Sequence, residues 1–401
     1  MSDLPRLSAA EAAARLGVKP ESLYAYVSRG LLSRERDAAG SWFDPLEVEA
    51  FARRRRRTPS TAPRATTTAP GTPLMVLETS LAHIDDDELF YRERAAAELA
   101  RTESFEAVLA WLWGADALRV PMPDDVSLAR RAMAALPDGA TTLDRLLVGV
   151  TAFAAADPLR HDPAPEHLAR IGSRLVTGLP AALAGEDAGG AVASTLWRAL
   201  TPSEHHDGPH VLDAALVLVI DHDLAVSTLA ARVAASARAS GYAVVTAALG
   251  AFDAPLHGTA SRPAARMLRA VRDGEPAGAA IARAVRDGGR GIPGFGQPLY
   301  AGADMRATVL LDLLRETPGT GDVLAAVDTV CAEVARRAGA APNLDLALGA
   351  LTLWARMPDD AGAVVFAMGR IGGWISHALE EYDERPMRLR PRGRYVGPAP
   401  E

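Results

Sequence analysis

Long segments with apolar residues repeated at steps of three and four dominate the chain from about residue 74 onward. Three of them read "ESFEAVLAWLWGADAL", "LDAALVLVIDHDLAVSTLAARVAASARASGYAVVTAALGAF" and "VLAAVDTVCAEVARRAG". This spacing places the apolar side chains on one face of a helix. Alternating patterns are scarce, and "LMVLETSLAHI" is the best candidate for a strand. The periodicity therefore predicts an all-α body of many packed helices.

Length and composition exclude several classes of protein. The 401 residues are enough for two or three domains. No apolar run approaches the length that crosses a bilayer, and the first residues lack the apolar core of a signal peptide, so we expect a cytoplasmic protein. The single cysteine, Cys331, rules out an internal disulfide. The net charge of −7 argues against a protein that coats nucleic acid with its whole surface.

Residues 1–57 predict a separate small domain. Ser8 can cap a helix that stops at Gly17, and Pro20 can open a second helix. A hairpin around residues 37–40 and a third helix would follow. This order, with the stretch "SAAEAAARLGVKPESLYAYVSRGLL", resembles the MerR-like and excisionase-like winged helix-turn-helix modules, whose second helix enters the DNA major groove.

On that resemblance, the residues of the second helix that would contact DNA are Lys19, Ser22, Tyr24 and Arg29. The arginine run at residues 53–57 could contact DNA phosphates, or it could be the solvated end of the third helix, where positive charge complements the helix dipole. The sequence leaves open whether the module binds DNA or makes protein contacts. Residues 58–73 are rich in Pro, Thr and Ala without apolar periodicity, and they predict a flexible linker.

Two of the nine histidines stand out by their surroundings. His222 follows an apolar run in "VIDHDLAVST", and His257 lies in "APLHGTAS". A histidine held at a junction between a loop and a helix can present its ring to a ligand, although a histidine taken alone is more often a satisfied core residue. The chain has no HExxH motif and no close Cys/His set, so no metal site is predicted.

Charged side chains inside apolar or glycine-rich stretches are further candidates. Asp345 follows "APNL" and faces an apolar segment, where loss of hydration would raise its proton affinity unless an ion pair neutralises it. Arginines in glycine-rich or aromatic segments suit bidentate binding of carboxylates. The arginines in such segments are Arg306, Arg370 and Arg390.

The loop "GRGIPGFGQPLYAGADMR" breaks the helical pattern on both of its sides. A rigid loop that exposes its backbone between helices is a candidate ligand contact. This loop and the motifs around the candidate residues, in their order along the chain, resemble the citrate synthase family. The matching stretches are "LETSLAHIDDDELFYR", "ESFEAVLAWLWGA", "DHDLAVSTLAARV", "APLHGTAS", "GIPGFGQPLYAGADMRA", "APNLDLALGAL", "GRIGGWISHALEEY" and "RPRGRYVGP".

The resemblance implies a multi-helical citrate synthase-like fold, with a large helical domain at 74–260 plus 349–401 and a small one at 261–348. Members of the family condense acetyl-CoA with oxaloacetate and hydrolyse the resulting thioester, without a tightly bound cofactor. The resemblance also implies that Asp345 is the base that removes a proton from the acetyl methyl group and that His257 stabilises the enol. Oxaloacetate would be bound by His222, Arg306, Arg370 and Arg390, with Arg390 reaching into the partner's site of a homodimer. CoA would be bound by Gly291, Ile292, Pro293, Gly294 and Gly296.

Two departures from the family pattern weaken a simple assignment. Gln297 stands where the family usually has a histidine that polarises the ketone of oxaloacetate. Its amide can donate a hydrogen bond but cannot carry a charge. Pro298 stands where an arginine commonly lies near the CoA phosphates. The sequence therefore predicts a slow or altered acyltransferase of the citrate synthase type, using acetyl-CoA or a close acyl-CoA. The alternative is a catalytically impaired homologue that acts as a ligand-sensing DNA-binding regulator or as the partner of a complete paralogue.

Overall fold

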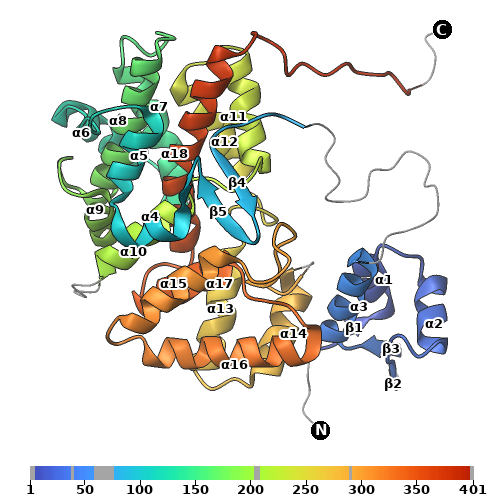
Figure 1. The fold of residues 1–401 in the computed structure, drawn as a ribbon. Helices are drawn as coiled ribbons and strands as arrows, with labels where there is room; N and C mark the ends of the chain where they lie inside the picture. Colours follow the sequence, from blue (N-terminus) through green and yellow to red (C-terminus); the bar gives the residue numbers. More distant parts are fainter. Residues whose placement is uncertain (1–4, 38–39, 58–75, 203–207, 289–290, 398–401) are drawn as a thin grey trace.

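The computed structural model describes residues 5–37, 40–57, 76–202, 208–288 and 291–397. Within these residues the chain forms eighteen α-helices and six short β-strands, and the helices make up nearly the whole body (Figure 1). The predicted all-α architecture of the body is confirmed. The predicted linker at 58–73 lies outside the described residues.

Figure 1 shows three parts of the molecule. The N-terminal module contains β1 (Leu7–Ser8), α1 (Ala9–Leu16), α2 (Pro20–Ser28), β2 (Glu35–Asp37), β3 (Gly40–Phe43) and α3 (Pro45–Arg57). The large body contains β4 (Ala82–Asp85), β5 (Glu88–Tyr91), β6 (Arg94–Ala95), α4 (Ala96–Thr102), α5 (Phe105–Trp113), α6 (Pro123–Ala134), α7 (Thr142–Ala156), α8 (Pro165–Ala184), α9 (Val192–Leu200), α10 (Gly208–Leu218), α11 (Val226–Ser236), α12 (Gly241–Phe252) and α18 (Ala361–Asp383). The small body contains α13 (Ser261–Arg272), α14 (Ala277–Gly288), α15 (Met305–Glu316), α16 (Gly321–Ala338) and α17 (Leu344–Trp354).

The N-terminal module has its own hydrophobic core and begins as the sequence predicts. Ser8 caps α1 in a capping box with Glu11, and the helix ends at Gly17, whose φ of 62° favours glycine. The antiparallel sheet has the strand order β1-β3-β2. Leu23 of α2 and Phe43 of β3 are buried in a cluster separate from the main core. Helices and hairpin follow the predicted order, while membership of the helix-turn-helix class stays a prediction.

The module is docked on the small body through α3, which contacts α14 and α16. Leu46 of α3 is fully buried and belongs to the main hydrophobic core of the chain. Burial of such a side chain contributes about 1.5–3 kcal/mol. Asp44 and Arg337 of α16 form an ion pair across the same interface. The module and the small body are therefore joined by apolar as well as charged contacts.

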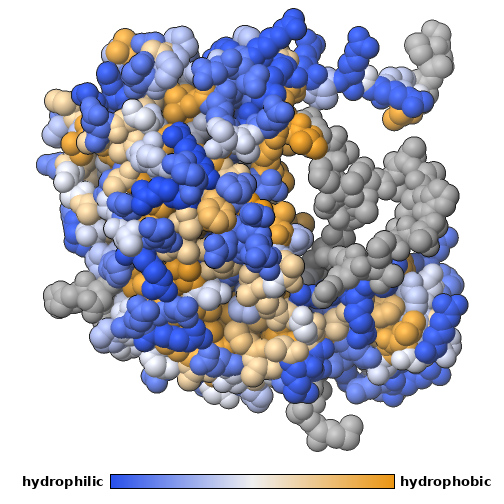
Figure 2. Space-filling view, in the orientation of Figure 1, coloured by the Kyte–Doolittle hydropathy of each residue, from blue (hydrophilic) through white to orange (hydrophobic). Residues whose placement is uncertain are grey.

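Glycines in α18 allow the central helix of the large body to lie directly against the end of α10. A Cβ atom at Gly373 would come within 2.0 Å of the Ile220 carbonyl oxygen, and one at Gly369 within 2.5 Å of the Leu216 carbonyl oxygen. Any larger residue at these positions would push the two segments apart. On the face drawn in Figure 2, hydrophilic residues are widely spread, and hydrophobic residues are exposed in patches between them.

Two local expectations need adjustment. The predicted strand in "LMVLETSLAHI" begins only at Ala82 of β4, which pairs with β5. The predicted domain boundary at residue 348 falls inside α17, which continues to Trp354. Gly349 lies so close to α13 that a Cβ atom there would be 2.9 Å from the Ala265 nitrogen. The division into domains otherwise stays a prediction.

Candidate active site

His222 lies in the buried segment that follows α10. Its Nε2 is 2.9 Å from the Tyr300 hydroxyl, which comes from the loop before α15. Only 6% of His222 is exposed. Burial, and then the positive charges of Arg306 and Arg370, lower the pKa of His222 well below its ordinary value. A neutral imidazole at this position can donate to an acceptor without adding charge.

Arg370 enters the same region from α18. Its Nε donates to the Val219 carbonyl oxygen at 2.9 Å, and its guanidinium carbon lies 5.0 Å from the centroid of the Phe366 ring. Its NH1 atom is 3.7 Å from Asp221 Oδ1 and is buried without a hydrogen-bond partner among the described residues. Because buried charged donors are normally satisfied, this atom is suited to bind an anion that enters the site.

Arg306 is held rigidly in the first turn of α15. Its Nε and NH2 donate to the two carboxylate oxygens of Asp304, at 3.0 and 2.8 Å. Asp304 Oδ2 also accepts from the Leu344 amide at 3.1 Å, which ties the start of α15 to the start of α17. Both side chains of the pair are almost fully buried. These bonds fix the guanidinium group of Arg306 between the starts of α15 and α17.

Asp345 lies in the first turn of α17. Asn343 caps this helix by accepting from the Asp345 amide at 3.0 Å. Although part of Asp345 is exposed, its carboxyl Oδ1 is buried and has no hydrogen-bond partner among the described residues. Burial raises the pKa of Asp345 to about 7, against the opposing effect of Arg306. A carboxylate with this proton affinity is an effective general base near neutral pH.

His257 lies in the turn between α12 and α13. Its Nε2 is 2.7 Å from the Ser227 hydroxyl, and Ser227 in turn accepts from the Trp374 indole at 3.3 Å. Edge contacts with Phe252 and Phe366 surround the ring. Burial and then the charge of Arg370 lower the pKa of His257 to about 4, so the ring is neutral at neutral pH.

The two arginines connect these groups into one electrostatic cluster. Arg370 acts on both His222 and His257, and Arg306 acts on both His222 and Asp345. The structure thus brings together two neutral histidines, two buried guanidinium groups and a carboxyl group of raised pKa. We call His222, His257, Arg306, Asp345 and Arg370 the polar cluster. The arrangement can bind an anion and move a proton nearby.

The glycine-rich loop is joined to the start of α17. The Gly296 amide donates to the Ala341 carbonyl oxygen at 2.9 Å, and the Asn343 amide donates to the Gly294 carbonyl oxygen at 2.9 Å. Gly294 has a φ of 81°, and a Cβ atom there would lie 2.8 Å from that of Leu346. The loop and Asp345 therefore form one connected structure.

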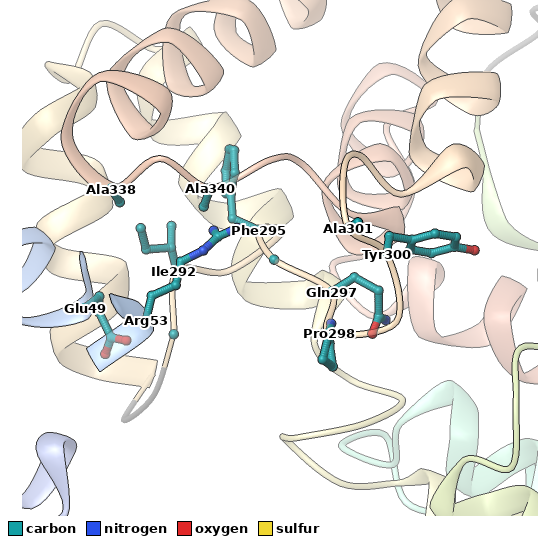
Figure 3. A pocket seen from close by; sticks show the side chains of 12 residues that line it. Glu49, Arg53, Ile292, Phe295, Gln297, Pro298, Tyr300, Ala301, Ala338 and Ala340 are labelled. Carbon is teal, nitrogen blue, oxygen red and sulfur yellow. The ribbon is translucent and has the colours of Figure 1, made fainter. Parts of the chain in front are cut away.

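A cavity of about 530 Å³ opens beside this loop. In Figure 3 the side chains of Arg53 and Glu49 approach it from α3, opposite Gln297 and Pro298. Tyr300 also lines the cavity and contacts His222, so it connects the cavity to the polar cluster. The other lining residues are Gly291, Ile292, Phe295, Gly296, Ala301, Ala338 and Ala340.

Comparison with known proteins identifies the family. The family model described as "Citrate synthase, C-terminal domain" matches residues 71–392, which is most of the chain. The chain belongs to the citrate synthase family. It is an enzyme of the citrate synthase type, a transferase for which oxaloacetate and an acyl-CoA fit as substrates and no tightly bound cofactor is needed.

Curated relatives and a solved structure agree with this assignment. The chain is 27% identical over 361 residues to the citrate synthase of Haloferax volcanii, covering 81% of this chain and 94% of the relative. It is 26% identical over 345 residues to 2-methylcitrate synthase 2 of Corynebacterium glutamicum, covering 78% and 90%. The Thermoplasma acidophilum citrate synthase, solved with carboxymethyl coenzyme A and oxaloacetate, has a TM-score of 0.65, with 22% identity and coverage of 82% and 95%. This last likeness shows the shared fold.

Within this citrate synthase-type chain, the predicted CoA-binding residues divide into two groups. Gly291, Ile292 and Gly296 line the cavity. Pro293 and Gly294 are not among its lining residues, and Gly294 backs onto Leu346 instead. Gln297 lines the cavity with a half-buried side chain, and its Oε1 accepts weakly from the Leu299 amide at 3.4 Å.

The remaining predicted residues lie away from the polar cluster. Arg390 is exposed on the segment after α18, which leads away from the body (Figure 1). In the N-terminal module, α2 is the helix farthest from the small body in Figure 1, and Tyr24 on it is 40% exposed. The other residues predicted to contact DNA are Lys19 and Arg29, both exposed, and Ser22, which is partly exposed. DNA binding stays a prediction.

The arginines at the end of α3 differ in their contacts. Arg55 turns back onto the module, donating to the Leu16 carbonyl oxygen at 3.1 Å, with its guanidinium carbon 5.4 Å from the centroid of the Tyr26 ring. Arg53 points toward the glycine-rich loop (Figure 3). The side chains of residues 56 and 57 lie outside the described part. The described arginines of the run therefore differ in direction, while the two alternatives for the run, phosphate contact or a solvated helix end, stay predictions.

Sequence reasoning missed the partners of the site residues. They are Ser227 beside His257, Tyr300 beside His222, Asp304 beside Arg306 and Asp221 beside Arg370. Each of these partners lies inside a stretch that resembles the family. The sequence could therefore have pointed to them only through their presence in those stretches. Glu49 and Arg53 carried no such signal, because they lie in the N-terminal module.

No group of three or more His, Cys, Asp or Glu residues in the described part of the chain is arranged to hold a metal ion. Among the described helices, none has both the length and the apolar character required to span a membrane.

Proposed function

We propose that the protein condenses a short acyl-CoA with oxaloacetate, with Asp345 as the base and His257 as the group that stabilises the enol. Asp345 takes a proton from the carbon next to the thioester carbonyl. The resulting nucleophilic carbon attacks the ketone carbon of oxaloacetate, and the thioester carbonyl re-forms. The ketone oxygen takes up a proton from water, and Asp345 releases the proton that it accepted. Water then cleaves the thioester, which releases CoA and the tricarboxylic acid.

The observation that carries this proposal is the unsatisfied NH1 atom of buried Arg370, in one electrostatic cluster with Arg306, whose charge also acts on the carboxyl group of Asp345. The free NH1 atom of Arg370 can donate to a carboxylate of oxaloacetate, and Arg306, although paired with Asp304, adds a second guanidinium group to the site. Asp345 has a pKa of about 7 and a free, buried oxygen that can receive a proton. Anion binding is thereby assigned to Arg370 and proton removal to Asp345.

The neutral state of His257 suits the role proposed for it. Since the Trp374 indole donates to the Ser227 oxygen, the serine hydroxyl is free to donate to Nε2 of His257. The ring would then hold its proton on Nδ1, where it can donate to the thioester oxygen as negative charge develops. A preorganised donor of this kind contributes about 2.7–4 kcal/mol to transition-state stabilisation.

Gln297 is proposed to donate its amide N–H to the ketone oxygen of oxaloacetate in place of the family histidine. Its amide nitrogen has no hydrogen-bond partner among the described residues. A neutral amide stabilises a developing oxyanion but supplies no proton. We therefore expect a slower condensation than a histidine at this position would give. The similarity to both citrate and 2-methylcitrate synthases supports acetyl-CoA and propionyl-CoA as the two candidate substrates.

The test is a thiol-release assay with oxaloacetate and either acetyl-CoA or propionyl-CoA. Mass spectrometry of the product would distinguish citrate from 2-methylcitrate. Release of CoA that depends on oxaloacetate and yields one of these acids supports the proposal. Thiol release without oxaloacetate would indicate simple thioester hydrolysis and would contradict it.

A second candidate function is a ligand-sensing regulator that binds DNA through α2. The observation that favours it is the docking of the N-terminal module beside the cavity, which places Glu49 and Arg53 next to the ligand loop. A gel-shift assay with genomic fragments would show DNA affinity that changes with oxaloacetate, citrate or CoA. Absence of any DNA binding at low salt would exclude this function, because phosphate contacts are strongest there.

A homodimer is proposed because Arg390 lies on a segment that leads away from its own polar cluster (Figure 1). In a dimer this arginine would enter the site of the partner and bind oxaloacetate. Light scattering at working concentration would report a mass of twice 42.2 kDa. A monomer that retains full activity would remove the role proposed for Arg390.

A further inference from the structure

We propose that Arg53 of the N-terminal module binds a phosphate group of the acyl-CoA, so that the module forms one wall of the substrate pocket. This inference rests on the proposed use of an acyl-CoA substrate. It assigns a ligand-binding role to a residue outside residues 71–392, which match the citrate synthase family.

The position of Arg53 points to a ligand in the cavity beside the glycine-rich loop. Its NH1 atom lies 4.0 Å from the place that a Cβ atom of Gly296 would occupy. In Figure 3 the side chain extends from α3 toward Ile292 and Phe295, and Gln297 and Pro298 lie on the opposite side. The guanidinium group therefore lies beside the loop proposed to bind CoA.

The charge of Arg53 is available to a ligand. Arg53 forms no hydrogen bond or ion pair with any of the described residues. Glu49, one helical turn earlier, also lines the cavity, but its carboxylate accepts from Arg15 at 3.2 Å. Because Arg15 neutralises Glu49, the cavity keeps a net positive side chain from α3.

The docking of the module holds Arg53 in place. NH2 of Arg15 donates to the carbonyl oxygens of Val285 and Arg286 of α14, the latter at 2.9 Å. Leu46, on the same helix as Arg53, is fully buried in the main core. A ligand contact from a helix held by such bonds costs less conformational entropy than a contact from a free arm.

The chemistry of the cavity fits a phosphorylated nucleotide. Its volume of about 530 Å³ lies in the range of small-molecule sites, about 300–1,000 Å³. Ile292, Phe295, Ala338 and Ala340 provide an apolar wall for a base or a pantetheine chain. Guanidinium groups bind phosphates bidentately, and Arg53 is the only arginine among the described residues that line this cavity. A DNA duplex does not fit into a cavity of this size, so the structure favours a small ligand for Arg53.

The experiment compares Arg53→Ala with Arg36→Ala in the full-length protein. Arg36 is an exposed arginine of β2 in the same module and does not line the cavity, which makes it the matched control. Isothermal titration calorimetry would measure the affinity for CoA and for 3′-dephospho-CoA. We expect R53A to bind CoA at least tenfold more weakly, R53K to recover part of the loss, and R36A to match the wild type.

The second ligand locates the contact. If R53A and wild type bind 3′-dephospho-CoA equally, Arg53 contacts the 3′-phosphate; an equal loss with both ligands assigns it to the diphosphate. The affinity for oxaloacetate should be unchanged in either case. Arg53 makes no intramolecular bond with the described residues, so thermal unfolding of R53A should match the wild type.

Two outcomes would overturn the inference, and they differ in what else they affect. If the wild type binds CoA and R53A binds it equally well, Arg53 has no such role and the proposed condensation is untouched. If the wild type binds no CoA under conditions where oxaloacetate binds, both the role of Arg53 and the proposed function fall.

Discussion

The polar cluster and the cavity beside the glycine-rich loop are built in opposite ways. In the cluster, Arg306 is bonded twice to Asp304, and His222 and His257 each have a hydroxyl partner. In the cavity, Gln297 makes one weak bond to its own loop and Arg53 makes none with the described residues. Most polar groups of the cluster are held by protein partners before a ligand arrives, with NH1 of Arg370 and Oδ1 of Asp345 left open. In the cavity, Arg53 and the amide nitrogen of Gln297 have no partner among the described residues.

This difference matches the two tasks that we propose. Proton transfer and stabilisation of a developing charge require groups held in fixed positions, because reorganisation during the reaction raises the barrier. Substrate binding tolerates side chains that adjust. Gln297 and Pro298, which the resemblance predicts to depart from the family pattern, both line the cavity.

The comparison is tested most strongly at Asp345. Replacement by Asn removes the base while keeping the shape, and we expect condensation to fall by about 10²–10⁴-fold. Stability should not fall, because the neutral amide has no charge to desolvate. Thiol release and thermal unfolding at pH 8 measure the two effects. A variant that keeps a tenth of the activity would assign the base to another residue.

The rigidity of the cluster predicts a large stability effect for Arg306→Ala. Loss of this arginine leaves Asp304 buried without its cation, which costs about 3–5 kcal/mol. Arg370→Ala should cost less, because Asp221 retains His377 at 3.1 Å. Urea denaturation of the two variants gives the difference. Equal losses would show that the Arg306–Asp304 pair is no more important to folding than the contacts of Arg370.

The raised pKa of Asp345 predicts the pH dependence. The base acts only when deprotonated, so kcat/KM should fall about tenfold per pH unit below a pKa of about 7. His257, with a pKa of about 4, stays neutral throughout this range. Because the folded-state pKa of Asp345 is above its unfolded value, its contribution to stability is lost as pH rises through about 7. The variant D345N should not lose stability in this pH range. If the free energy of unfolding of D345N depends on pH as that of the wild type does, the pKa of Asp345 is not raised.

The cavity beside the glycine-rich loop is tested by Gln297→His. An imidazole restores a group that can carry charge, and we expect turnover to rise by about tenfold, with Gln297→Ala falling by a similar factor. Steady-state kinetics with saturating CoA ester would separate kcat from KM. A fall in kcat for Q297H would mean that the amide has a role that histidine cannot fill.

The smallest effect is expected at the boundary between the two regions, for Tyr300→Phe. Loss of the hydroxyl removes the 2.9 Å bond to His222, worth about 0.5–1.5 kcal/mol. We expect KM for oxaloacetate to rise by about twofold to tenfold without a comparable change in the affinity for CoA. Loss of CoA affinity instead would show that Tyr300 serves the cavity more than the cluster.

The sequence alone predicted the elements whose signals are local. Ser8 and Gly17 bounded α1 correctly, because caps act within a few residues of the helix end. The candidates His222, His257, Asp345, Arg306 and Arg370 were selected from short stretches that resemble the family, and the structure gathers them. Their partners, such as Ser227, were not predicted, because a hydrogen bond across 30 residues has no local pattern.

The periodicity of apolar residues and the ordered motifs determined that this chain is a helical member of the citrate synthase family with an added N-terminal module. Only the tertiary structure decided where that module lies and that Arg53 turns toward the ligand loop while Arg55 turns back. Both residues belong to one run of identical side chains, so nothing in the local sequence distinguishes them. What separates them is the docking of α3 on α14 and α16, which depends on contacts between residues more than 200 positions apart.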